Sequence, residues 1–189
     1  SKATFKFLHD GSNSSTSWVV SPTDVRETVG TTQHELFETA EFSTSVGVEI
    51  NYSSSQFSST EKAQFVVKNG TGNPVNYTTP LGTFDVGQNL ATFYIDADNA
   101  TAADRLKVGL NGGVLLTGNT ETASPSAADS QLDFTIYGGF TAHWQEVLVW
   151  NAEQINNRSK IETNIGNYYG ITLSGILNNY PGAAVGYSL

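Results

Sequence analysis

Alternation of apolar and polar residues along much of the chain predicts a series of short β-strands. The alternation is strict from Val46 to Tyr52, where every second residue is apolar, as in a strand with one buried face. Comparable runs are expected at residues 3–9, 17–21, 34–40, 62–68, 90–96, 105–111, 132–136 and 144–150. Turn signals such as Asn69-Gly70 separate them. Roughly ten or more short strands with frequent turns are typical of a two-sheet sandwich.

The last two of these runs contain the strongest pattern. Residues 132–136 alternate between apolar and polar side chains, and Gly138-Gly139 then interrupts the alternation. Residues 144–150, with the sequence WQEVLVW, are apolar on both faces except at Gln145 and Glu146. We therefore expect this strand to lie in a sheet that another layer covers.

A helix is expected to follow this strand. Asn151 is a suitable N-cap, because its side chain can accept hydrogen bonds from the backbone of the next turn. Gly170 is well placed as the C-terminal stop. The apolar residues between them recur at roughly helical spacing, namely Ile155, Ile161, Ile165 and Tyr168 or Tyr169.

The region from 132 to 171 also resembles the C-terminal part of laminin-G-like, or concanavalin A-like, jelly-roll domains, particularly those of bacteriophage structural proteins. Residues 7–13, FLHDGSN, are similar to the opening of the same domains, but the chain has Ala142 near a place where they usually have glycine. The residues that carry the resemblance are Gly138, Gly139, Phe140, Gln145, Glu146, Trp150, Arg158, Ile161, Glu162, Asn164, Ile165, Tyr168 and Tyr169.

This resemblance implies an all-β fold, a two-sheet antiparallel jelly-roll β-sandwich of the concanavalin A-like kind with one short C-terminal helix. The sandwich is expected to span residues 1–172. Residues 173–189 are rich in glycine and alanine, and they resemble a linker or the start of a following domain. The alternative is a C-terminal tail that packs on the sandwich.

Composition excludes several classes of function. With 18 acidic residues against 9 basic ones, the formal net charge of −9 argues against binding to nucleic acid and to anionic membrane surfaces. No apolar run approaches the ~20 residues that a membrane-spanning helix needs, so membrane insertion is not expected. The chain has no cysteine, which excludes disulfides and thiolate metal sites. A cysteine-free β-domain fits a bacterial or viral origin better than a secreted eukaryotic one.

Glu146 is a candidate for chemistry, because alternation along 144–150 would place it on one strand face with Trp144, Leu148 and Trp150. A carboxylate buried between aromatic rings has a raised pKa and can act as a general acid. The alternative interpretation is that Glu146 bonds backbone groups or Arg158 and holds the helix to the sheet. A glycosidase needs a second carboxylate across the sugar, and jelly-roll glucanases usually carry Glu-x-Asp-x-Glu on one strand, a run that is absent from this sequence.

Acidic and amide side chains gather after the expected strand at 90–96, and they form a candidate calcium site. Calcium prefers several oxygen ligands, and laminin-G-like domains often hold calcium at the rim of the sandwich. The alternative is a solvated acidic turn in which Asp104 caps a turn or pairs with Arg105. A zinc site is not expected, because the three histidines lie far apart along the chain. The candidate calcium ligands are Asp96, Asp98, Asn99 and Asp104.

Aromatic residues near loops are candidates for sugar recognition, since the C–H faces of a pyranose stack on aromatic rings and its hydroxyls bond polar side chains. Most aromatic residues in a β-sandwich are simply part of the core, which is the alternative for each candidate. The candidate ligand-binding residues are Trp18, Tyr52, Tyr77, Tyr137 and Glu146.

The leading hypothesis is a non-catalytic carbohydrate-binding or decoration module of a phage virion surface protein. It would be extracellular and attach weakly to cell-surface or environmental glycans. Contacts with other virion subunits, bound calcium and assembly into a homo-oligomer are further expectations. One alternative is a polysaccharide depolymerase or glycoside hydrolase of concanavalin A-like fold. Another is a structural or oligomerisation module without a ligand. Fold by itself does not decide between them.

Overall fold

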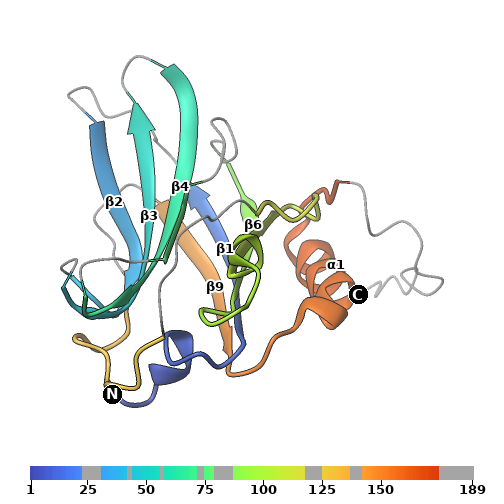
Figure 1. Ribbon diagram of the computed structural model, residues 1–189. Helices are drawn as coiled ribbons and strands as arrows, with labels where there is room; N and C mark the ends of the chain where they lie inside the picture. Colours follow the sequence, from blue (N-terminus) through green and yellow to red (C-terminus); the bar gives the residue numbers. More distant parts are fainter. Residues whose placement is uncertain are drawn as a thin grey trace.

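The chain folds into two antiparallel sheets that face each other, with one helix outside them (Figure 1). The computed structural model describes residues 1–22, 31–41, 44–55, 58–71, 75–78, 87–117, 125–136 and 142–174. The all-β, jelly-roll-like antiparallel sandwich with one short C-terminal helix, expected from the sequence, is thereby confirmed.

Within the described residues the two sheets contain four and five strands. The four-stranded sheet has the order β7-β6-β1-β9 and the five-stranded sheet the order β5-β4-β3-β2-β8. The strands of the first sheet are β1 (Ser14–Pro22), β6 (Asn89–Ile95), β7 (Leu106–Leu110) and β9 (Ala142–Trp150). Those of the second are β2 (Thr31–Glu38), β3 (Val46–Ser55), β4 (Ser58–Asn69), β5 (Val75–Thr78) and β8 (Thr135–Ile136).

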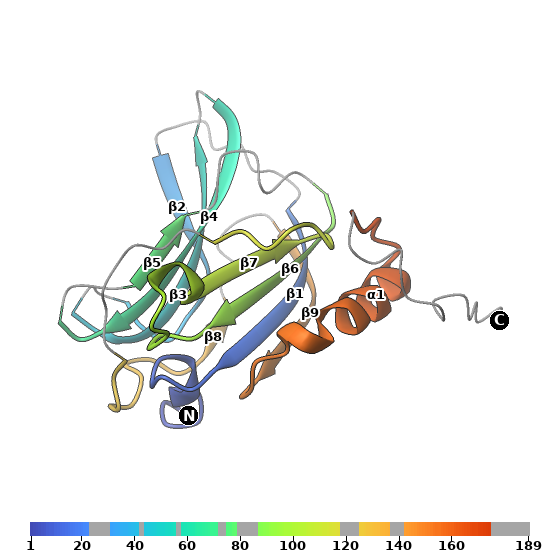
Figure 2. The ribbon, with the colours of Figure 1, turned by 45° about the vertical axis from the view of Figure 1, so that its right-hand side comes forward.

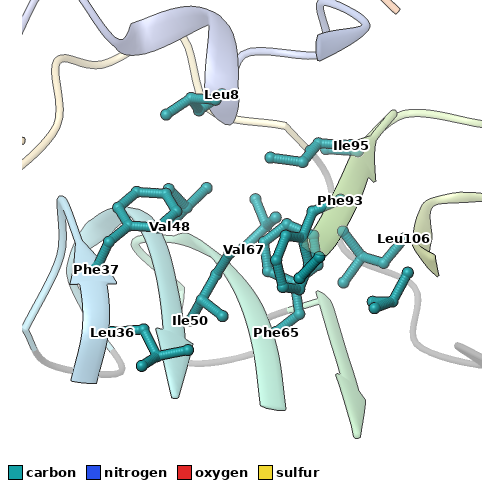
Figure 3. Close-up of a cluster of buried hydrophobic side chains, with 13 residues drawn as sticks. Leu8, Leu36, Phe37, Val48, Ile50, Phe65, Val67, Phe93, Ile95 and Leu106 are labelled. Atoms are coloured by element: carbon teal, nitrogen blue, oxygen red, sulfur yellow. The ribbon is translucent and has the colours of Figure 1, made fainter. Parts of the chain in front are cut away.

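The main core lies between the sheets, and alternate residues of β3, β4, β6 and β7 point into it (Figure 3). Phe65 of β4 and Phe93 of β6 meet there edge to face, with ring centroids 5.3 Å apart. Both side chains are almost completely buried, as are those of Phe37, Ile50 and Leu106. Burying each such side chain is worth about 1.5–3 kcal/mol, so this layer holds the two sheets together.

A second, smaller core lies on the outer face of the four-stranded sheet. It is built from Val19 and Leu90 of the sheet and Ile165 of α1 (Arg158–Tyr169), with Leu148 packed against them. Figure 2 shows α1 on the side of this sheet that faces away from the five-stranded sheet. The sheet is therefore covered on both faces, and all seven residues of β6 are buried. WQEVLVW does form a strand that α1 overlies, but the expectation that it lies inside the sheet was wrong, because β9 is the edge strand of the described sheet and its residues 144–150 are half-buried or exposed.

Two expected strands were wrong. Residues 3–9 form turns and the 3₁₀ helix η1 (Lys6–Leu8), because Phe5 and Leu8, three residues apart, reach the core from a turn. Leu8 is fully buried and the rings of Phe5 and Phe134 lie 4.6 Å apart. The expected strand at 132–136 shortens to β8, which comprises two residues. Period-two apolar spacing does not distinguish such turns from strands.

The helix begins later than expected. Asn151 is not its cap, because the 3₁₀ helix η3 (Ile155–Asn157) comes directly before α1. A further 3₁₀ helix, η2 (Ala102–Asp104), lies between β6 and β7. The backbone N–H of Gln154 donates to the hydroxyl of Ser15 at 2.8 Å, which fastens this connection to β1. Gly170 is confirmed as the C-terminal stop, because it adopts the left-handed conformation with φ of 70°.

Leu173 and Ser174 pack on the domain beyond this stop. Leu173 lies against Gly166 of α1, where its side-chain carbon is 2.8 Å from the position that a Cβ would take. The backbone N–H of Ser174 donates to the carbonyl of Asn111 at 2.6 Å. Residues 175–189 lie outside the described residues, so a linker or a following domain at 173–189 stays a prediction.

Candidate functional site

A β-bulge in β9 decides which side chains face α1. In the pairing of β1 with β9, Val19 lies opposite Glu146 and Val20 opposite Trp144, so that Gln145 is an extra residue. Such an insertion moves the residues on one side of it to the other face of the sheet. The expectation that Trp144 and Glu146 share a face was therefore wrong: Trp144 packs on the main core, as Val147 does.

Beyond the bulge, alternate residues of β9 point toward the helix. These residues are Glu146, Leu148 and Trp150. They form one wall of a pocket of about 430 Å³ between β9 and α1. The facing wall comes from one side of α1 and consists of Ile161, Asn164, Ile165, Tyr168 and Tyr169. We call this pocket the β9/α1 groove.

A buried ion pair fixes the first turns of α1 on the sheet. The Nε atom of Arg158 donates to Glu162 at 2.8 Å, and its Nη2 atom donates to the carbonyl of Gly113 at 2.5 Å. Both side chains are at least 90% buried. Gly109 of β7 makes room for them, because a Cβ there would lie 2.6 Å from Nη2 of Arg158. Arg158 thus pairs with Glu162, and the alternative that it serves as the partner of Glu146 was wrong.

Tyr94 of β6 lies beneath the same ion pair. Its ring is 3% exposed. Burial raises the pKa of its hydroxyl, and the negative charge of Glu162 raises that pKa further, against the opposing effect of Arg158. The hydroxyl therefore stays protonated at neutral pH, and Tyr94 is not among the residues described as lining the β9/α1 groove.

The C-terminal turn of α1 supplies the aromatic wall of the groove. The Tyr168 and Tyr169 rings lie 4.8 Å apart at an interplanar angle of 81°. Tyr168 is 79% exposed. The Tyr169 hydroxyl donates to the carbonyl of Gln145 at 3.2 Å, a group that the bulge displaces from the regular ladder. The bulge thus positions both Glu146 and the ring facing it.

Glu146 and Tyr169 interact across the groove. The pKa of the Tyr169 hydroxyl is raised, first by partial burial, then by the negative charge of Glu146 and by Tyr168. Glu146 itself is half-buried, less enclosed than the sequence led us to expect. The groove therefore offers aromatic and apolar surface with a carboxylate and the Asn164 amide, a combination that orients small polar ligands.

For the other predicted ligand-binding residues, the structure describes the backbone of three and the side chain of none. Tyr52 and Tyr77 belong to β3 and β5 of the five-stranded sheet, whereas Glu146 belongs to the four-stranded one. Trp18 lies in β1, paired with Ala91 and Val147. The side chains of these three residues lie outside the described part of the structure, as does all of Tyr137. Their roles stay predictions.

Sequence reasoning placed Leu148 and Trp150 on the strand face of Glu146, as the structure does, but it missed the residues of α1 that face them. Tyr168 and Tyr169 were visible as part of a helical repeat, and they were interpreted as packing residues. The signal that could have revealed them was the doublet Tyr168-Tyr169, because a helix that buries one of two adjacent rings must expose the other. Asn164 gave no signal of its own.

The acidic loop after β6 only partly fits the expected calcium site. Asp96 and Asp98 lie close together, and partial burial followed by the neighbouring Asp98 raises the pKa of Asp96, against an opposing hydrogen bond from Asn99. That bond runs from the Asn99 amide nitrogen to Asp96 at 2.7 Å.

The remaining ligand of that loop points elsewhere, since Asp104 pairs with Lys107 at 3.3 Å. Across the described ranges, no group of three or more histidine, aspartate and glutamate side chains is arranged to hold a metal ion. Two carboxylates are fewer oxygen ligands than calcium normally takes. Calcium binding by Asp96, Asp98, Asn99 and Asp104 stays a prediction.

Comparisons with known proteins support the fold. No protein-family model matches the chain, and no curated protein matches it. Among solved structures, the chain is similar to the binding domain of botulinum neurotoxin DC in complex with rat synaptotagmin II, with a TM-score of 0.52 and 9% identity. The alignment covers 84% of this chain and 36% of the neurotoxin chain.

This likeness defines the class of fold, a jelly-roll-like β-sandwich. The chain spans 36% of the length of the structure that it matches. That structure is a binding domain, and at 9% identity its partner is a property of the neurotoxin alone. No described helix is both long and apolar enough to cross a bilayer.

Proposed function

We propose that this domain is a non-catalytic carbohydrate-binding module that mediates weak attachment to cell-surface or environmental glycans. The observation that carries the proposal is the β9/α1 groove, where Trp150, Tyr168 and Tyr169 surround Glu146 and Asn164. Aromatic faces can stack on the C–H faces of a sugar ring, while the carboxylate and amide bond its hydroxyls. The Tyr168 ring is 79% exposed, so a ligand stacked on it stays partly in solvent, which suits weak and reversible attachment.

The proposed setting is the surface of a phage virion. The resemblance of residues 132–171 to phage structural domains supports it, and so does the acidic, cysteine-free composition. The proposal carries with it an extracellular location, contacts with other virion subunits and a homo-oligomeric assembly. Calcium binding by the loop that contains Asp96 and Asp98 is a further part of the proposal, and it can be tested separately.

A non-catalytic role fits the groove better than glycoside hydrolysis. Hydrolysis uses two carboxyl groups, about 5–5.5 Å apart in retaining and about 6.5–9.5 Å apart in inverting enzymes. Among the residues described as lining the groove, Glu146 is the one carboxylate. Glu162, the nearest acidic residue on the buried side of α1, is bound to Arg158.

A glycan-array screen of the whole chain tests the proposal. The screen is run with calcium and with a chelator, and each polysaccharide that binds is assayed for new reducing ends. The proposal predicts binding without new reducing ends. New reducing ends would support the hydrolase instead, and the absence of any binding would favour a structural module without a ligand. Loss of binding with the chelator would support calcium in the acidic loop.

Matched variants locate the binding site. Tyr168→Ala removes a ring that is 79% exposed, so it should weaken glycan binding without lowering stability. Val114→Ala is the control, because Val114 is 75% exposed and is not among the residues that line the groove. Equal binding by the two variants would contradict the assignment of the site to the β9/α1 groove.

A further inference from the structure

The charge of the β9/α1 groove points to a narrower class of ligand. We propose that the groove binds an organic ammonium group, carried by an amino sugar or by a quaternary ammonium substituent of a polysaccharide. This inference rests on the proposed glycan-binding function and specifies its ligand. It follows from the combination of electron-rich rings and a carboxylate in one pocket.

Three aromatic rings line the groove from both of its walls. Trp150 comes from β9, and Tyr168 and Tyr169 come from the end of α1. The planes of the two tyrosine rings are nearly perpendicular, at 81°, so their faces point in two different directions. A cation is attracted to the face of such rings, most strongly to tryptophan, and quaternary ammonium ligands are recognised in this way.

Glu146 supplies the formal charge that a cation needs. Its carboxylate lies on the same wall as Trp150 and interacts with the Tyr169 hydroxyl. An ionised carboxylate accepts hydrogen bonds but cannot donate them. A primary ammonium group donates three, so it complements this site better than a neutral hydroxyl does.

Competing cations are held away from the groove. The residues described as lining it include neither lysine nor arginine. Arg158, on the same helix, is bound to Glu162 and to the carbonyl of Gly113. The net charge of −9 adds a long-range attraction for cations and a repulsion for uronic acids and other acidic sugars.

Two pairs, each of a cationic ligand and a neutral counterpart, test the inference on the whole chain. Glucosamine is compared with N-acetylglucosamine, and choline with its neutral isostere 3,3-dimethylbutanol. Affinity is measured by calorimetry, and the indole N–H signal of Trp150 is followed by NMR. We expect each cation to bind about tenfold more tightly than its neutral counterpart. Tighter binding of glucosamine than choline would indicate an amino sugar, and the reverse a quaternary substituent.

Two variants distinguish charge from ring stacking. Glu146→Gln keeps the shape of the side chain and should reduce the preference for the cation to the part that the aromatic rings supply. Tyr168→Phe keeps the ring and should retain affinity, whereas Tyr168→Ala should weaken it. Far-ultraviolet circular dichroism confirms that each variant is folded.

The outcomes separate this inference from the proposed function. Equal affinity for charged and neutral ligands, unchanged in Glu146→Gln, would overturn the ammonium inference and leave glycan binding intact. Glycan binding on the array with no response of Trp150 to any of the four ligands would also overturn it. Failure of the proposed function itself would be visible as an array without any bound glycan.

Discussion

Removal of Arg158 should destabilise the domain far more than removal of the whole ion pair to which it belongs. In Arg158→Met, the carboxylate of Glu162, which is 1% exposed, loses the guanidinium that bonds it at 2.8 Å. The carbonyl of Gly113 loses its donor as well. Leaving one buried charge without its partner costs about 3–5 kcal/mol. For a chain of this size that corresponds to a fall in Tm of roughly 6–20 °C.

The double variant Arg158→Met/Glu162→Leu should recover most of this loss. Both charges are then absent, and apolar side chains of similar length fill the space between α1 and β6. Replacing a buried ion pair in this way is often neutral or stabilising by about 1–4 kcal/mol. We therefore expect the double variant to lie within about 1 kcal/mol of the wild type or above it.

Equilibrium unfolding in urea, followed by tryptophan fluorescence and circular dichroism, measures these differences. Lys107→Met is the control, because Lys107 pairs with Asp104 at 3.3 Å and the aspartate is 44% exposed. The Lys107 side chain is 18% exposed, so this partly exposed pair should contribute about 1 kcal/mol, less than the buried pair of Arg158 and Glu162. The reasoning would be refuted if Arg158→Met cost no more than this control, or if the double variant were as unstable as Arg158→Met.

Gly109→Ala should cost about 1–3 kcal/mol in urea unfolding, because the added Cβ would lie 2.6 Å from the Arg158 guanidinium; a neutral effect would mean that the guanidinium moves aside freely. Burial lowers the pKa of His9 below its ordinary value of 6.5, so at mildly acidic pH the unfolded chain binds more protons than the folded one. The contribution of His9 to the free energy of unfolding is therefore complete above pH 6.5 and is lost as the pH falls through the lowered pKa. His9→Gln should flatten this decline in thermal melts, and an unchanged slope would contradict it. Asp96 has a raised pKa, so the pH dependence is reversed. The stability that protonated Asp96 contributes is lost as the pH rises through its pKa in the folded state. Asp98→Asn should therefore raise Tm at neutral pH with chelator present, whereas a loss of Tm confined to calcium buffer would support a metal in this loop.

Much of the sandwich followed from the sequence alone. Strands such as β3 and β6, the turn at Gly70 with φ of 85° and the helix stop at Gly170 all follow from local chemistry. Alternation, turn residues and a left-handed glycine act within a few residues, so each is visible in the chain itself.

Only the tertiary structure decided which side chains meet in the β9/α1 groove. The bulge at Gln145 exists only in relation to β1, and it turns Trp144 into the main core while leaving Glu146 facing α1. The contacts of Arg158 with Gly109 and with the Gly113 carbonyl fasten α1 to the sheet, and the Tyr168-Tyr169 end of the helix faces that carboxylate across the groove. A register between strands and a contact between distant elements are properties of the packed chain, and no local period encodes them.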